Sequence, residues 1–201
     1  MQYPDFYTKV APIRLYDPLS DFLGALKEGE VEVTYLDCVK LAGHSCPTIA
    51  GAYLLAAKGL AALYGDTLPR RGSIKVEMKE NEDAGVTGVT ATILSFILGA
   101  GGVGGFKGIL GQFSRNDLLF FGSTMNAEVR LTCLNTMKSV DLSYDPSLVK
   151  ADEKMKPLMG KCLQGLASTE EKKIFQQLWQ ARVEEILLNK EYHNKLITIV
   201  Q

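Results

Sequence analysis

The stretch LAGHSCPTIAGAYLLAAKGLAALY, residues 41–64, contains the apolar helical pattern that predicts the centre of the fold. From Pro47 to Tyr64 apolar residues occur almost all round the helix, which is typical of a helix buried in a core. Pro47 suits the first helical position, because an N–H group there would have no partner within the helix. The pattern therefore predicts a central buried helix over residues 47–64.

The segments that follow alternate between strand and helix patterns. Residues 73–78 place Ile74, Val76 and Met78 on one face of a strand, and residues 86–98 form a second apolar helical pattern. Short connections separate three further strand-like segments, which indicates an antiparallel element; these are residues 118–122, 127–134 and 139–144. An α+β domain is the expected fold class.

The two ends of the chain differ from this apolar middle. Residues 17–26 predict a short helix, and residues 31–35 alternate like a strand. Near the C-terminus, residues 152–166 and 168–189 predict charged amphipathic helices, the second opened by a capping box of Ser168 and Glu171, and residues 196–200 predict a final strand. We therefore predict three segments: a lead-in (1–29), an α+β domain (30–145) and a helical extension (146–201) that packs on the domain or on a dimer partner.

Charge and apolar content exclude several classes of function. The chain of 201 residues carries 22 Lys and Arg against 23 Asp and Glu, so no long-range field favours nucleic acid or an anionic membrane. The longest apolar run, residues 86–98, is too short to cross a bilayer, and the first residues lack a signal peptide pattern. The four cysteines form no CxxC pair, which favours reduced thiols over a disulfide framework. We expect a cytoplasmic protein.

His44 and Cys46 are the candidate ligands of a metal or cofactor. Cys46 precedes Pro47 at the helix start, where free amides and the helix dipole stabilise a thiolate, and residues two apart on an extended backbone share a face. Zinc accepts mixed nitrogen and sulfur ligands. Glu80 and Asp83 are the predicted further ligands of an open site, and Glu82, Cys133 and His193 are the other candidates for a third ligand. The simpler interpretation is that both His44 and Cys46 are packed side chains in a core turn.

These residues also carry a resemblance to a known family. Residues 35–53, YLDCVKLAGHSCPTIAGAY, resemble the N-terminal motif of the FmdE family of formylmethanofuran dehydrogenase components, in which HGHxCPG leads into a helix. The resemblance continues through residues 75–122, with the family's order of strand, acidic turn, helix, glycine-rich loop and strand. It implies a curved, mostly antiparallel sheet cradling buried helices, frequent dimers, and a transition metal such as zinc bound through His44 and Cys46.

The chain departs from this family at positions that matter for metal binding. Ala42 stands where the family has its first histidine and Thr48 where it has glycine. Gly85 and Ala100 occupy positions at which the family has cysteines. The chain is therefore expected to be a divergent member whose metal site is weak, is completed by another chain, or is converted to hold a different cofactor.

Three functions remain open. The first is an FmdE-like homodimer that binds a transition metal or cofactor at His44 and Cys46. The second is a haem or tetrapyrrole binder with His44 or Cys46 as axial ligand, because haem needs only one or two such ligands and an apolar pocket. The third is an enzyme acting on a small molecule, with Cys46 as nucleophile or an open metal as Lewis acid, assisted by Glu80 or Asp83.

Other residues receive more ordinary interpretations. The glycine-rich stretch of residues 99–117 is expected to be a structural loop, with a ligand-enclosing flap as the functional alternative. Phe175 and Trp179 predict a packing seam on the second C-terminal helix. His193 has polar neighbours and is expected to be solvated, and Cys38 and Cys133 are expected to pack as small apolar residues.

Overall fold

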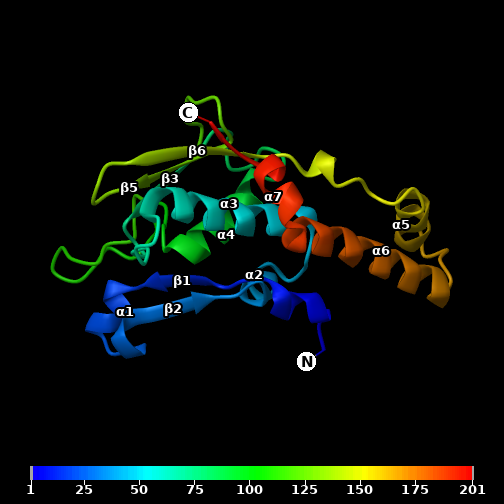
Figure 1. Ribbon diagram of the computed structural model, residues 1–201, viewed down its shortest axis with the longest axis horizontal. Helices are drawn as coiled ribbons and strands as arrows, with labels where there is room; N and C mark the ends of the chain where they lie inside the picture. The colour runs from blue at the N-terminus through cyan, green and yellow to red at the C-terminus, as the bar shows by residue number, and fades with distance from the viewer. Residues whose placement is uncertain (1, 201) are drawn as a thin grey trace.

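In a computed structural model, which describes residues 2–200, the chain forms three layers (Figure 1). A five-stranded sheet covers one side of two central helices, and a two-stranded sheet covers the other side. No helix in the described part of the chain combines the length and the apolar character that a membrane crossing requires. The expected α+β class is confirmed.

The middle layer consists of α3 (Pro47–Tyr64) and α4 (Thr87–Leu98), which pack against each other. Pro47 occupies the first position of α3 as predicted, and α4 begins one residue later than its sequence pattern. Side chains such as Ile49 and Ile93 are completely buried, and each aliphatic side chain of this kind contributes about 1.5–3 kcal/mol to the hydrophobic stabilisation of the fold.

The large sheet has the strand order β4-β3-β5-β6-β7. Its members are β3 (Ile74–Met78), β4 (Leu119–Phe120), β5 (Val129–Cys133), β6 (Ser139–Tyr144) and β7 (Ile197–Val200). Every pairing is antiparallel except that of β4, which runs parallel to β3. The expectation of three antiparallel strands was wrong for β4, because the connection from β3 crosses over through α4 before it returns to the sheet.

The small sheet pairs β1 (Ile13–Tyr16) with β2 (Glu30–Val33) in antiparallel register. Between the strands lie α1 (Pro18–Phe22) and a short 3₁₀ turn, so the helix expected over residues 17–26 ends four residues early. Tyr53 of α3 donates its hydroxyl to the carbonyl of Val33, which ties this hairpin to the central layer. The hairpin joins residues on both sides of the predicted segment boundary at 29/30.

The remaining helices are α2 (Tyr35–Ala42), α5 (Met155–Leu163), α6 (Thr169–Leu188) and α7 (Lys190–Leu196). The capping box of Ser168 and Glu171 opens α6 as predicted. The C-terminal half of α6 packs on α3, whereas its first half extends away from the sheets together with α5 (Figure 1). One hydrophobic core includes residues from Phe6 to Ile197 and therefore draws on all three predicted segments.

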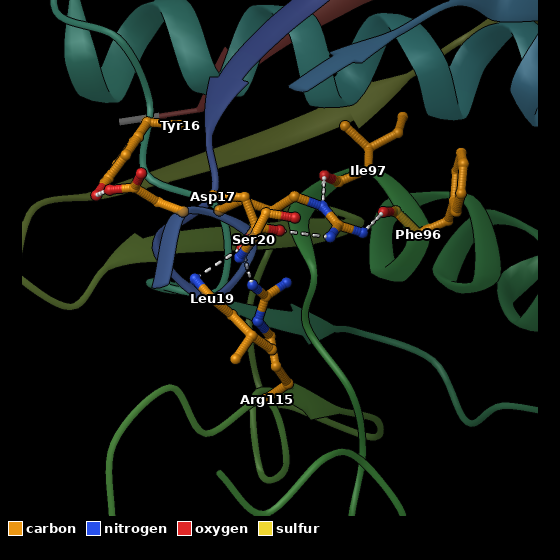
Figure 2. Close-up of polar contacts among 9 residues, drawn as sticks. Tyr16, Asp17, Leu19, Ser20, Phe96, Ile97 and Arg115 are labelled. Atoms are coloured by element: carbon orange, nitrogen blue, oxygen red, sulfur yellow. Dashed lines mark hydrogen bonds and ion pairs between the residues drawn. The ribbon is translucent and has the colours of Figure 1, made fainter. Parts of the chain in front are cut away.

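A buried carboxylate connects the small hairpin to the central layer (Figure 2). Asp17, only 3% exposed, is the N-cap of α1 and forms ion pairs with Arg71 at 2.9 Å and Arg115 at 2.5 Å. Arg71 also donates to two carbonyls at the end of α4, those of Phe96 and Ile97. Asp17 thereby links the hairpin, the end of α4 and the glycine-rich loop.

The glycine-rich loop is held by close backbone contacts. A Cβ atom on Gly105 would lie 2.6 Å from the Arg115 carbonyl oxygen and 2.8 Å from the Asn116 Cα, so a larger residue would force these two segments apart. The loop lies at the opposite end of the molecule from α6 (Figure 1). These contacts favour a structural role for the glycines over the alternative of a ligand-enclosing flap.

Candidate functional site

A three-residue link between two helices carries the predicted ligands. Gly43 ends α2 in the left-handed conformation, with φ of +74°, and donates its N–H to the Val39 carbonyl. Pro47 then begins α3. His44, Ser45 and Cys46 are therefore held between two helix ends whose positions are determined locally by glycine and proline.

Helix α6 fixes this link from the side. The Ser45 carbonyl accepts a hydrogen bond from the Trp179 indole N–H at 2.9 Å and another from the Gln180 amide at 3.4 Å. The Ser45 hydroxyl lies 2.9 Å from the hydroxyl of Tyr35, in the core. Because the carbonyl and the hydroxyl of Ser45 are both engaged, the link is held in one conformation, and α6 is part of the site.

His44 is exposed, and one of its ring nitrogens is already engaged. Its Nδ1 lies 3.0 Å from the Ala42 carbonyl oxygen, which can only accept a hydrogen bond. In the neutral ring, the contact therefore favours the tautomer in which Nδ1 carries the proton and Nε2 keeps its lone pair. Metal-binding histidines are oriented in this way, with one nitrogen donating to a carbonyl and the other facing the metal.

An open groove of about 490 Å³ lies beside His44. Its volume falls within the range of about 300–1,000 Å³ that small-molecule sites occupy. Phe175 and Trp179 form its aromatic wall, with ring centroids 5.8 Å apart. The lining residues are Pro4, His44, Ser45, Phe175, Gln176, Trp179 and Gln180.

Cys46 has other neighbours. It is half-buried at the N-cap of α3, packs against the core, and its sulfur forms no capping hydrogen bond within the described residues. Burial raises the pKa of both Tyr35 and Tyr144, and the nearby Cys46 adds to that shift. Among the described residues, those that line the groove include His44 but not Cys46. His44 and Cys46, the two candidate ligands of one metal or cofactor, therefore do not both line this groove.

Glu80 and Asp83 lie in the exposed turn between β3 and α4. Glu80 lines a second hollow, of about 450 Å³, together with Thr48 and Tyr144. Within residues 2–200, no group of three or more His, Cys, Asp or Glu side chains is placed to hold a metal ion. The structure thus does not bring His44, Cys46, Glu80 and Asp83 together as one ligand set, because Glu80 lines a different hollow from His44.

The secondary predictions have mixed outcomes. Cys38 and Cys133 are buried as expected, and burial raises the pKa of Cys38 to about 12. The expectation of a solvated His193 holds only in part: the residue is half-buried, its Nε2 lies 3.0 Å from the Leu187 carbonyl oxygen, and partial burial lowers its pKa. His193 is partly covered because α7 packs against α6.

Sequence reasoning missed the role of Phe175 and Trp179 in the groove. The two aromatic residues are four apart on a helix that is otherwise rich in charge, and this spacing places them on one face. Trp179 packs against the core, as the predicted packing seam requires, but both side chains are only half-buried. The half-exposed pair instead provides the aromatic wall beside His44.

Comparison with known proteins adds no assignment. The chain matches no protein-family model, and no curated protein matches it.

Proposed function

We propose that this protein binds a flat, largely apolar, metal-centred cofactor of the tetrapyrrole class in the groove beside His44. The observation that carries the proposal is the orientation of His44, next to an aromatic wall. Its Nδ1 faces the Ala42 carbonyl, and its Nε2 has no hydrogen-bond partner within residues 2–200. A histidine nitrogen of this kind is the usual proximal ligand of haem iron. His44 is the proposed axial ligand.

The residues of the groove fit such a cofactor. Phe175 and Trp179 offer aromatic faces to a planar macrocycle. Lys172 is exposed on α6 one turn before Phe175, so its ammonium group is available to an anionic edge of the ligand. When bound, a haem supplies gas-binding or electron-transfer chemistry at its iron. The protein's own part is to donate one nitrogen and to shield one face of the ring from water.

The proposal also treats the chain as a divergent member of the FmdE family, which its sequence resembles. Support comes from the order β3, acidic turn, α4, glycine-rich loop and β4, which is the order of the family's segments. Gly85 and Ala100, which replace family cysteines, remove sulfur ligands and leave a site that depends more on histidine. A homodimer and a cytoplasmic location stay predictions.

Haem titration tests the proposal, with a matched control within the chain. We expect a shifted Soret band in the wild type, together with quenching of fluorescence from Trp179, the only tryptophan in the chain. His44→Ala should abolish the Soret shift and weaken binding by about tenfold or more, because it removes the metal–ligand bond. His193→Ala, which removes the other histidine, should leave both signals unchanged.

Two outcomes would contradict the proposal. One is a wild-type protein whose titration shows no Soret shift. The other is an equal loss of signal in His44→Ala and His193→Ala, which would mean that binding does not depend on the histidine at the groove.

A single transition-metal ion held by His44 and Cys46 is the second candidate. It is favoured by the uncapped position of the Cys46 sulfur at the start of α3. Elemental analysis of the purified protein should then find about one metal per chain, lost in Cys46→Ala. Cys162→Ala is the matched control, because Cys162 is also a free, half-buried cysteine but lies on α5. Equal metal content in all three proteins would reject this candidate.

A further inference from the structure

The groove beside His44 is half of a site for a flat ligand. It is open to solvent, and its lining comes from Pro4, the link at His44 and Ser45, and one face of α6. Sites for small molecules usually bury about 70–90% of the ligand's surface. A planar macrocycle that lies on Phe175 and Trp179 leaves its opposite face in water. One chain therefore provides an incomplete site for the proposed cofactor.

The chain does not supply a second axial ligand at this groove. Haem proteins use histidine, cysteine, methionine or tyrosine side chains as axial ligands. Among the described residues that line the groove, His44 is the only one of these types. His193, the other histidine of the chain, lies on α7, and its Nε2 is already within 3.0 Å of the Leu187 carbonyl oxygen. A second axial nitrogen must therefore come from another molecule.

The groove face of α6 continues to a lysine. Residues three and four apart on a helix are neighbours on one face. Lys172 lies three residues before Phe175 and four before Gln176, and Trp179 and Gln180 continue the same face. Lys172 is exposed and forms no ion pair within residues 2–200. Each groove therefore has one unpaired ammonium group at the edge nearest the start of α6.

The symmetry of haem matches two such grooves. Its two carboxylates lie on one edge of the ring, symmetrically about an axis that runs in the ring plane through the iron. A half-turn about this axis exchanges the two faces and the two carboxylates, and a half-turn also relates the copies in a two-fold symmetric dimer. Two copies on this axis place one His44 on each face and one Lys172 at each carboxylate. One groove satisfies half of these groups.

Resting on the proposed cofactor, we propose that two copies of the chain enclose one haem between their grooves. His44 of each copy supplies one axial nitrogen, and the aromatic wall of each copy covers one face of the ring. Tyr3 and Ile174, each next in sequence to a lining residue, are 40% and 36% exposed and add apolar area between the copies. Because the protein fills both axial positions, the site suits electron transfer rather than gas binding.

Haem titration of the full-length wild type, followed by absorbance and by sedimentation velocity, tests the shared site. We expect the Soret signal to saturate at one haem per two chains and the loaded protein to sediment as a dimer. The ferric spectrum should be that of low-spin, six-coordinate iron with two histidine ligands. Saturation at one haem per chain on a monomer, or a high-spin five-coordinate spectrum, would overturn the shared site and leave the cofactor proposal standing. Absence of any Soret shift would overturn both.

Variants of neighbouring lysines test how the two copies hold the carboxylates. Lys172→Gln should weaken haem binding by about tenfold or more, because both carboxylates lose a charged partner. Lys173→Gln is the matched control, since Lys173 is also exposed but lies about 100° further round α6, and it should leave the affinity unchanged. Haem dimethyl ester, in which both carboxylates are masked, should bind equally to the wild type and to Lys172→Gln. Equal haem affinity in the wild type and Lys172→Gln would overturn the proposed arrangement.

Discussion

At the residue scale, Asp17 is the most constrained charged side chain. It is almost completely buried and accepts hydrogen bonds from two arginines and from two backbone N–H groups of α1 (Figure 2). Arg115 itself has a side chain only 11% exposed. Removing the Asp17 carboxylate therefore leaves the positive charge of Arg115 without its partner in a poorly solvated environment.

Asp17→Ala is expected to lower the free energy of unfolding by about 3–5 kcal/mol, the cost of breaking a buried pair by removing one partner. Urea denaturation at neutral pH measures this. Glu30→Ala provides the comparison, because its ion pair with Arg14 is exposed at both ends and should contribute less than about 1 kcal/mol. Similar losses in both variants would show that burial of the Asp17 cluster does not matter.

The same carboxylate predicts a pH dependence. Burial alone would raise the pKa of Asp17, but hydrogen bonds from Ser20, Arg71 and Arg115 outweigh burial and hold that pKa below its ordinary value of 3.8. The unfolded chain therefore takes up this proton at a higher pH than the folded protein does. The contribution of Asp17 to stability is complete above the ordinary value and is lost as the pH falls through the folded pKa.

The stability difference between the wild type and Asp17→Asn should accordingly narrow as the pH falls below about 4. Urea midpoints measured between neutral and acidic pH test this. A difference that stays constant over the whole range would show that the Asp17 charge contributes nothing.

At the element scale, the position of α3 against the sheet depends on small residues. A Cβ atom on Gly51 would overlap the ring of Tyr144, the last residue of β6, and would lie 2.6 Å from its Cζ atom. Tyr144 in turn donates its hydroxyl to the Pro47 carbonyl at 2.9 Å. The start of α3 is therefore held against β6 by a contact that only glycine permits.

Gly51→Ala is expected to destabilise the protein by about 1–3 kcal/mol through overpacking, although alanine has the higher helix propensity. Gly160→Ala in α5 is the matched control, since nothing lies within 4 Å of the added methyl group, and it should stabilise by up to about 1 kcal/mol. Thermal unfolding of both variants measures whether each substitution lowers or raises the stability of the protein. A stable Gly51→Ala protein would mean that α3 does not pack this closely on β6.

At the scale of the whole molecule, the C-terminal extension is part of the core. Five of its aliphatic side chains are no more than 3% exposed; they are Val183, Ile186, Leu187, Leu196 and Ile197. At about 1.5–3 kcal/mol each, their burial approaches the entire free energy of unfolding of an ordinary domain, about 5–15 kcal/mol. The extension also supplies β7 to the sheet and the aromatic wall of the groove.

A chain that ends at residue 145 is therefore expected not to fold cooperatively. Its thermal transition, followed by circular dichroism, should be broad or absent, and it should bind a hydrophobic dye that the full-length protein excludes. A sharp transition near that of the full chain would show that residues 1–145 fold without the C-terminal extension.

Local signals in the sequence determined the central helices and the start of α6. The pattern from Pro47 to Tyr64 predicted α3 to the residue, and Ser168 with Glu171 marked the beginning of α6. Helices can be predicted in this way because their hydrogen bonds, caps and faces involve residues at most four positions apart. The position of His44 and Cys46 before Pro47 was likewise readable from the sequence.

Only the tertiary structure decided the strand pairing and the shape of the site. The parallel pairing of β4, the strand β1 and the helix α7 depend on partners distant in the sequence, and the groove exists because Trp179 reaches the carbonyl of Ser45, 134 positions away. Such contacts leave no local periodicity, since their energy comes from burial and hydrogen bonding across the fold. The sequence by itself therefore indicated His44 and Glu80 as candidate ligands. Tertiary packing decided that these two residues line different hollows and that Phe175 and Trp179 lie beside His44.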